Sequence, residues 1–262
     1  MRRNPSKIGW PTLRTSATRF EESRTQQAAP HLSVVIPVFN EAEILQALFA
    51  RLLPVLESCE ETFEVLFVND GSTDGSARIL DEASTRSPHV ACIHLQPNRG
   101  QHQAILEGFR LARGEWIITL DADLQNPPEE IPKLLEAFRH GHDVIGTYRV
   151  GRQDPWARRF ASRSINTMLQ RVWGITFRDM GCMLRGYTRA IAAEVAREPR
   201  RDVFIPAAGL LHARNPIEIP VEHAERHAGT SKYGVRQLIK LSRSVTRTLR
   251  NGRTRQGAAH AE

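Results

Sequence analysis

Short apolar runs recur along this chain, and each of the first four is followed by a stretch with the apolar periodicity of a helix. These four runs have the β-branched and aromatic content of buried strands: Leu32–Ile36, Phe63–Val68, Val90–Leu95 and Trp116–Leu120. Weaker strand candidates follow at Asp143–Thr147, Cys182–Tyr187 and Ile217–Val221. Strands that alternate with helices predict an α/β fold, in which a mainly parallel sheet carries helices on both faces.

The length of 262 residues suits one domain with terminal extensions. We expect residues 1–30 to be a disordered, basic segment, because they mix Arg, Ser, Thr, Gln and Pro without apolar periodicity. Residues 31–233 would then form the domain, and residues 234–262 a basic amphipathic helix and tail. Helices are also predicted at Pro155–Trp173 and Gly234–Arg250.

The formal charge of +7 favours a polyanionic partner, either nucleic acid, an anionic lipid surface or a phosphorylated substrate. We expect no nucleic acid, because basicity is not accompanied by interleaved aromatic groups or a known module. The sequence shows no signal peptide and no apolar run near the ~18 to 20 residues that cross a bilayer. Three scattered cysteines suggest no disulfide framework, which fits a reducing, cytoplasmic setting.

The carboxyl ends of parallel strands are the places where ligands bind in such a fold. After the first strand come Pro37, which we expect to end the strand, and Asn40, for which a plain helix N-cap is one interpretation. After the second strand comes Asp70 in a glycine-containing turn. Asp70 would accept hydrogen bonds from a ribose or base, or the turn would simply cap the next helix.

The strongest local signal follows the fourth strand, where Asp121 and Asp123 are separated by one residue. Two such carboxylates repel each other unless a cation lies between them and an anion. Oxygen ligands of this kind suit Mg²⁺ or Mn²⁺ bridging to a nucleotide diphosphate. A solvated acidic turn is the alternative.

Basic residues gather further along the chain. Arg158 and Ser162 share one face of the helix expected at 155–173, where guanidinium groups can hold a phosphate or simply face solvent. A later glycine-containing loop, 223–233, would close cationic groups over phosphates. The arginine-rich segment after it carries apolar residues on one helical face, so it would lie either on an anionic membrane surface or against solvent.

Several motifs in this order resemble the family 2 glycosyltransferases, whose nucleotide-sugar-binding fold is called GT-A. They are PVFNE, VNDGSTDGS, NRGQH at Asn98–His102, and DADLQNPPEE. Within that family, GTYR, RRFASR, DMGCMLRGY, IEIPVEHAER and GTSKY are similar to the polyprenyl-phosphate transferases that load L-arabinose or mannose. The resemblance covers about residues 31–241.

The resemblance implies a role for each matching residue. The nucleotide-sugar would be bound by Pro37, Phe39, Glu41, Asp70 and Asp121. The divalent ion would be held by Asp121, Asp123 and Gln125. The acceptor phosphate and other phosphates would be bound by Arg149, Arg158, Ser162, Arg226 and Lys232. Asp123 and Asp179 are the candidate catalytic residues, with Asp179 near the sugar.

The expected activity is therefore inverting, metal-assisted transfer of a sugar from a UDP- or GDP-sugar to a polyprenyl phosphate. A phosphate acceptor is already ionised near neutral pH and needs no general base. The rival is a soluble transferase acting on a saccharide or other polar acceptor, with Asp179 as the base.

The L-arabinose transferases carry two membrane-spanning helices where this chain has an arginine-rich tail. We therefore expect peripheral association with the inner face of the membrane, through the tail or a separate membrane subunit. The sequence also allows a homo-oligomer.

Overall fold

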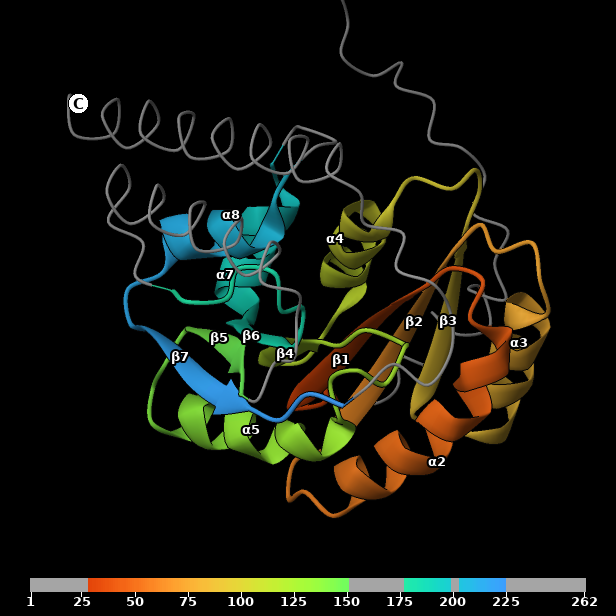
Figure 1. Ribbon diagram of the computed structural model, residues 1–262, viewed down its shortest axis with the longest axis horizontal. Helices are drawn as coiled ribbons and strands as arrows, with labels where there is room; N and C mark the ends of the chain where they lie inside the picture. Colours follow the sequence, from red (N-terminus) through yellow and green to blue (C-terminus); the bar gives the residue numbers. More distant parts are fainter. Residues whose placement is uncertain (1–27, 151–176, 199–202, 225–262) are drawn as a thin grey trace, which may run out of the picture.

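The computed structural model describes residues 28–150, 177–198 and 203–224 (Figure 1). A seven-stranded sheet forms the centre of this part of the chain. Its strands are β1 (Leu32–Val38), β2 (Phe63–Asp70), β3 (Val90–Leu95), β4 (Trp116–Thr119), β5 (Val144–Arg149), β6 (Arg185–Thr188) and β7 (Pro216–Val221). Each strand lies on one of the expected runs, although β6 begins at Arg185 and not at Cys182.

The strand order is β3-β2-β1-β4-β6-β5-β7. All neighbouring pairs are parallel except those of β6, which runs antiparallel to both β4 and β5. The carboxyl ends of the other strands therefore share one edge of the sheet with the amino end of β6. This reversal brings the turn before β6, residues 179–184, to the edge where a parallel sheet binds ligands.

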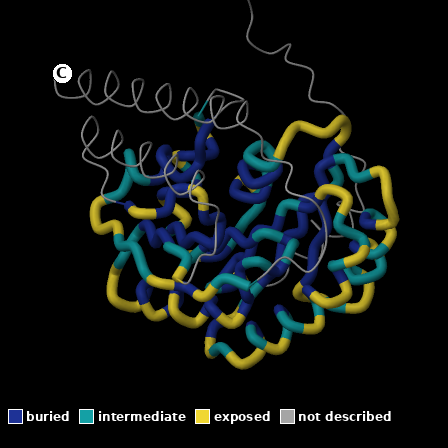
Figure 2. The backbone as a smooth tube through the Cα atoms, viewed as in Figure 1, coloured by how far each residue is buried: buried dark blue, intermediate teal, exposed yellow. Residues whose placement is uncertain are grey.

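Helices cover both faces of the sheet (Figures 1 and 2). They are α2 (Ala42–Glu57), α3 (Ser76–Arg86), α4 (Gln101–Leu111), α5 (Ile131–Arg139), α7 (Arg189–Ala196), α8 (Ile205–His212) and the short 3-10 helix η1 (Pro128–Glu130). Alternate residues of β2 divide between two cores: Phe67 belongs to the core that includes residues of α2 and α5, whereas Leu66 belongs to the core that includes residues of α4 and α7. The strands are apolar on both faces because both are covered.

The sequence predicted that Pro37 would end β1, and this prediction is wrong. Pro37 lies inside the strand, opposite Val68 of β2. The β1–β4 pairing stops at Val35, whose carbonyl accepts the last bond on that side from Leu120. In a parallel strand, the backbone N–H and C=O groups of residues two apart point to the same neighbouring strand. Pro37 therefore points to the side of β4, as Val35 does, where no strand remains at its level. Its missing N–H thus costs no hydrogen bond.

The predicted helices at 155–173 and 234–250 lie outside the described residues. Helices α7 and α8 were not anticipated. No helix within the described ranges is long and apolar enough to cross a membrane.

Candidate active site

The loops after β1 and β2 are joined by reciprocal hydrogen bonds. Asn40 has a positive φ of 57°. Its amide N–H donates to Ser72 Oγ at 3.0 Å, and its Oδ1 accepts from the Thr73 N–H at 2.8 Å. Asn40 is therefore not the N-cap of α2, a position that Glu41 occupies without a side-chain cap bond. It ties the two loops into one surface.

Asp70 ends β2, and both of its carboxylate oxygens accept backbone N–H groups from the loop before α4. Oδ1 accepts from Arg99 at 2.8 Å and Oδ2 from Gly100 at 2.7 Å. Gly71 has a φ of 70°, and a Cβ there would lie 2.9 Å from the Asn98 nitrogen. The close approach of the two loops thus requires glycine at 71, and Asp70 fixes the loop that precedes Gln101.

Asp121 follows β4 and accepts a hydrogen bond from the side chain of Gln101, with 2.6 Å between Nε2 and Oδ1. Burial, with a further contribution from the charge of Asp123, raises the pKa of Asp121 to about 7. The charge of Glu41 acts in the same direction, whereas Gln101 and Arg149 oppose it. Glu41, Asp123 and Arg149 are thus each close enough to Asp121 for their charges to act on it.

Asp123 lies on a tight turn. Its Oδ1 accepts the Gln125 N–H at 3.2 Å, and Leu124 between them has a φ of 57°. The carbonyl of Gln125 accepts the Ala224 N–H at 3.0 Å, which ties this turn to the chain after β7. A left-handed non-glycine residue beside paired carboxylates is the kind of strained backbone that clusters at functional sites.

The donor set fits a hard divalent cation. Two carboxylates and the Gln125 amide offer oxygen ligands. Burial, and next the charge of Asp123, raise the pKa of Asp121, so a positive charge beside Asp121 would favour its ionised form. A cation there would remove the repulsion between Asp121 and Asp123.

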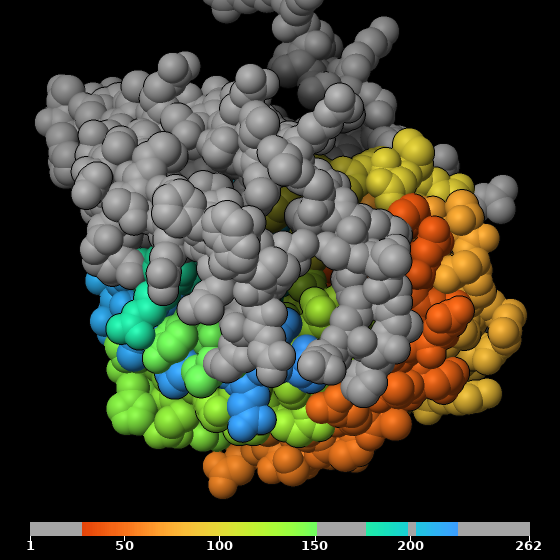
Figure 3. All heavy atoms as spheres, viewed as in Figure 1, coloured from red at the N-terminus to blue at the C-terminus, as the bar shows by residue number. Residues whose placement is uncertain are grey.

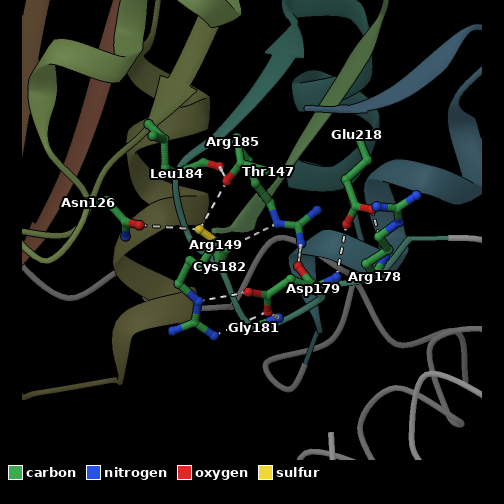
Figure 4. A network of polar contacts seen from close by, with 10 residues as sticks. All are labelled: Asn126, Thr147, Arg149, Arg178, Asp179, Gly181, Cys182, Leu184, Arg185 and Glu218. Carbon is green, nitrogen blue, oxygen red and sulfur yellow. Dashed lines mark hydrogen bonds and ion pairs between the residues drawn. The ribbon is translucent and has the colours of Figure 1, made fainter. Parts of the chain in front are cut away.

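Arg149 ends β5 and forms a bidentate ion pair with Asp179 (Figure 4). Its Nε donates to Oδ2 at 2.7 Å and its Nη2 to Oδ1 at 3.2 Å. Burial opposes the charge of Arg149, but the Asp179 carboxylate outweighs that effect and raises the pKa of Arg149. Arg149 thus remains a cation beside Asp121.

The expected site residues in the described ranges come together at the carboxyl edge of the sheet. Phe39 is exposed there, with 39% of its surface accessible, and Pro37 is partly buried. Figure 3 shows the α2–α3 half (orange) on one side of the molecule and the α5–β7 half (green and blue) on the other. Four of the predicted phosphate ligands lie outside the described residues: Arg158, Ser162, Arg226 and Lys232.

Sequence reasoning missed the residues that hold the site residues in place. Gln101 stands in the NRGQH motif, and its contact with Asp121 gives that motif a role. Cys182 Sγ lies 3.3 Å from Asn126 Oδ1, and Thr147 Oγ1 donates to the carbonyl of Leu184 at 2.7 Å. Thr147 is a polar residue within a predicted strand, and that was the signal the sequence offered for it.

A second cluster, Asp81, Cys92 and His94, has its ligand atoms within 4.8 Å of one another. Hydrogen bonds account for it without a metal. Asn69 Oδ1 accepts the Ser72 N–H at 3.0 Å, so its amide nitrogen donates to His94 Nδ1 at 2.8 Å. His94 then carries its proton on Nε2 and donates it to Asp81 at 3.0 Å.

Comparison with known proteins identifies the class. The family model described as "Glycosyl transferase family 2" matches residues 33–196. This chain therefore belongs to glycosyl transferase family 2, as its motifs indicated, and its fold is GT-A.

A curated relative is the undecaprenyl-phosphate 4-deoxy-4-formamido-L-arabinose transferase of Edwardsiella ictaluri (strain 93-146). It is 49% identical over 211 residues, which cover 80% of this chain and 65% of the relative. The chain thus spans just under two thirds of that protein's length.

The fold is also that of glucosyl-3-phosphoglycerate synthase from Mycobacterium tuberculosis. Its complex with Mn²⁺, UDP and glucosyl-3-phosphoglycerate gives a TM-score of 0.60 at 15% identity, covering 93% of this chain and 86% of that one. Its complex with Mn²⁺, UDP-glucose and phosphoglyceric acid gives 0.63 at 15% identity, covering 93% and 84%. At this identity the likeness concerns the fold alone.

Proposed function

We propose that this chain is an inverting glycosyltransferase that moves a sugar from a nucleotide-sugar to a polyprenyl phosphate. The proposal rests on one observation: a pair of carboxylates and an arginine lie close together at one edge of the sheet. The carboxylate pair Asp121 and Asp123 suits a cation-bound diphosphate, and the buried cation Arg149 beside it suits a second phosphate.

The donor would lie across the joined loops after β1 and β2. Phe39 offers an exposed ring for the base, and Glu41 offers a carboxylate for the base or ribose. Asp70 would support the nucleotide by holding the loop before α4 through the Arg99 and Gly100 N–H groups. Asp121, Asp123 and Gln125 would hold Mg²⁺ or Mn²⁺, which when bound neutralises charge on the diphosphate leaving group. Gln101 keeps Asp121 oriented through its 2.6 Å hydrogen bond.

The acceptor phosphate would be received by Arg149, together with the predicted ligands Arg158 and Ser162. A phosphate monoester is ionised near neutral pH, so its oxygen can attack the anomeric carbon without a general base. The protein's task is then to place two mutually repelling phosphate groups within reach of each other. A single displacement inverts the anomeric centre.

The relative's name supports this acceptor class, since it describes an undecaprenyl-phosphate transferase at 49% identity. The L-arabinose derivative in that name is a candidate for the donor sugar. Peripheral association with the inner face of a membrane would bring the chain to a lipid phosphate, and its formal charge of +7 favours such a surface.

The test is nucleotide diphosphate release by the purified protein from a panel of UDP- and GDP-sugars, with Mg²⁺ or Mn²⁺, and with or without undecaprenyl phosphate in detergent. We expect release that requires the lipid and the metal. Asp123→Asn should reduce it at least about a hundredfold, because one ligand charge is lost where the leaving group needs neutralisation.

Glu82→Gln is the matched control, since Glu82 is a carboxylate on α3 that pairs with Arg78 outside the site. It should release nucleotide like the wild type. Slow release that ignores the lipid would favour a saccharide or other polar acceptor. Release that persists in Asp123→Asn would contradict the assigned metal site.

A further inference from the structure

The turn before β6 holds Asp179 in a position where both of its oxygens are already used. Oδ2 accepts from Arg149 Nε at 2.7 Å, and Oδ1 accepts from Arg149 Nη2 at 3.2 Å and from the Gly181 N–H at 3.1 Å (Figure 4). The pair is shielded from solvent, with side-chain exposures of 15% for Arg149 and 9% for Asp179. Protonation of Asp179 would break a buried, bidentate charge pair.

The backbone of this turn is fixed from two strands. Glu218 on β7 accepts the N–H groups of Arg178 and Asp179 at 2.8 and 2.9 Å. Arg185 on β6 donates to the carbonyl of Asp179 at 2.6 Å and to that of Cys182 at 2.7 Å. The carboxylate of Asp179 thus has a defined position before any ligand binds.

Arg185 is fully buried, and its Nη1 has no hydrogen-bond partner within the described part of the chain. Burying a guanidinium group is costly even when most of its N–H groups are bonded. The sheet makes room for it at Gly146 of β5, where a Cβ would lie 2.4 Å from Phe177 and 3.1 Å from Arg185 Nη1. This costly arrangement serves to hold the turn that carries Asp179.

Arg149 keeps binding capacity after this pairing. A guanidinium group has five N–H donors, and the pair uses one on Nε and one on Nη2. The remaining donors suit a phosphate, and the planar group can bind it with two parallel bonds if its plane is held. Asp179 holds that plane.

We propose that Asp179 is a positioning residue that presents Arg149 to a phosphate-bearing acceptor, and is not the proton acceptor of the reaction. The inference rests on the proposed function and refines its acceptor. A hydroxyl acceptor needs a free carboxylate as base, whereas Asp179 is committed to Arg149. The site therefore selects acceptors that arrive already ionised, namely phosphate monoesters.

Binding of farnesyl phosphate, a water-soluble short-chain probe, tests the proposal without relying on turnover. Titration calorimetry would compare the wild type with Asp179→Asn, with farnesol as the uncharged control ligand. We expect Asp179→Asn to weaken farnesyl phosphate binding at least about tenfold and the wild type not to bind farnesol measurably. Glu129→Gln is the matched variant, because Glu129 forms the same bidentate pair with Arg51 on the outer surface; it should bind like the wild type.

A double-mutant cycle shows whether Asp179 acts through Arg149. In an Arg149→Met background, Asp179→Asn should cost little further affinity, because the group that it positions is gone. In the transfer assay, Asp179→Asn should raise the KM for the lipid phosphate more than it lowers kcat, and should leave the pH midpoint of kcat unchanged. A thermal shift by UDP with Mn²⁺ that matches the wild type would show that the variant is folded.

Three outcomes would overturn the proposal. Unchanged binding by Asp179→Asn would remove the positioning role while leaving the proposed function intact. Loss of kcat at saturating acceptor, with KM unchanged and the ascending acidic limb missing from the pH profile, would make Asp179 a proton acceptor. A wild type that hydrolyses the donor but does not bind farnesyl phosphate would refute the proposed acceptor, and the role of Asp179 with it.

Discussion

His102 lies in the first turn of α4, next to Gln101, and its Nδ1 is buried without a hydrogen-bond partner in the part of the chain that the structure describes. Its ring meets Phe204 edge-on, with 5.6 Å between the centroids. Burial lowers the pKa of His102 to about 4, from an ordinary value of 6.5. The folded protein therefore holds His102 neutral in a pH range where the unfolded chain protonates it.

The sign of the pH effect follows from proton binding. Between pH 6.5 and about 4 the unfolded state binds more protons at this position, so the free energy of unfolding falls as the pH falls. The loss is on the order of 3 kcal/mol over that range. Urea unfolding at pH 7 and pH 5 should show a smaller drop for His102→Gln than for the wild type.

His140 at the end of α5 provides the control, because its side chain lies at the surface with 66% exposure. His140→Gln should keep the acid sensitivity of the wild type. An equal drop in stability for His102→Gln and the wild type would show that other groups cause the acid sensitivity.

At the scale of elements, α4 approaches β1 so closely that it needs a glycine. A Cβ on Gly108 would lie 2.3 Å from Val35 Cγ1. Gly→Ala inside a helix ordinarily stabilises it by about 1 kcal/mol. Here the overlap should reverse the sign, and we expect Gly108→Ala to lower the free energy of unfolding by about 1–3 kcal/mol.

Chemical denaturation of two further variants separates the overlap from helix propensity. Adding Val35→Ala should make Gly108→Ala less harmful than it is alone, because the clashing methyl groups are gone. Gly75→Ala, before α3, has only an ordinary contact of 3.8 Å and should be nearly neutral. Stabilisation by Gly108→Ala alone would mean that α4 can shift away from β1.

At the scale of the whole molecule, net charge bears on which surfaces the chain can bind. The formal charge of +7 should draw it to anionic membranes. In sedimentation with vesicles, we expect binding to those rich in anionic lipid and not to zwitterionic ones. Raising the salt from about 0.05 to 0.5 M should release most of the bound protein, since screening shortens the reach of surface charge. Binding that survives high salt would indicate apolar insertion.

Much of the fold follows from local pattern. The period of apolar residues predicted the positions of the seven strands. The parallel strands put their carboxyl ends, with Asp70 and Asp121, at one edge of the sheet. Strand ends were less predictable. Pro37 is tolerated inside β1 only because the β1–β4 pairing stops at Val35. That is a property of the sheet and not of the segment.

The sequence by itself determined the family, the class of fold and the types of side chain at the site, because motifs and periodicity are local. The tertiary structure decided which groups meet. Only the antiparallel insertion of β6 brings Asp179 to Arg149. Only the packing of α4 against β1 and β2 brings Gln101 to Asp121. Such contacts join residues far apart in the chain, and their energies depend on burial that no local pattern specifies.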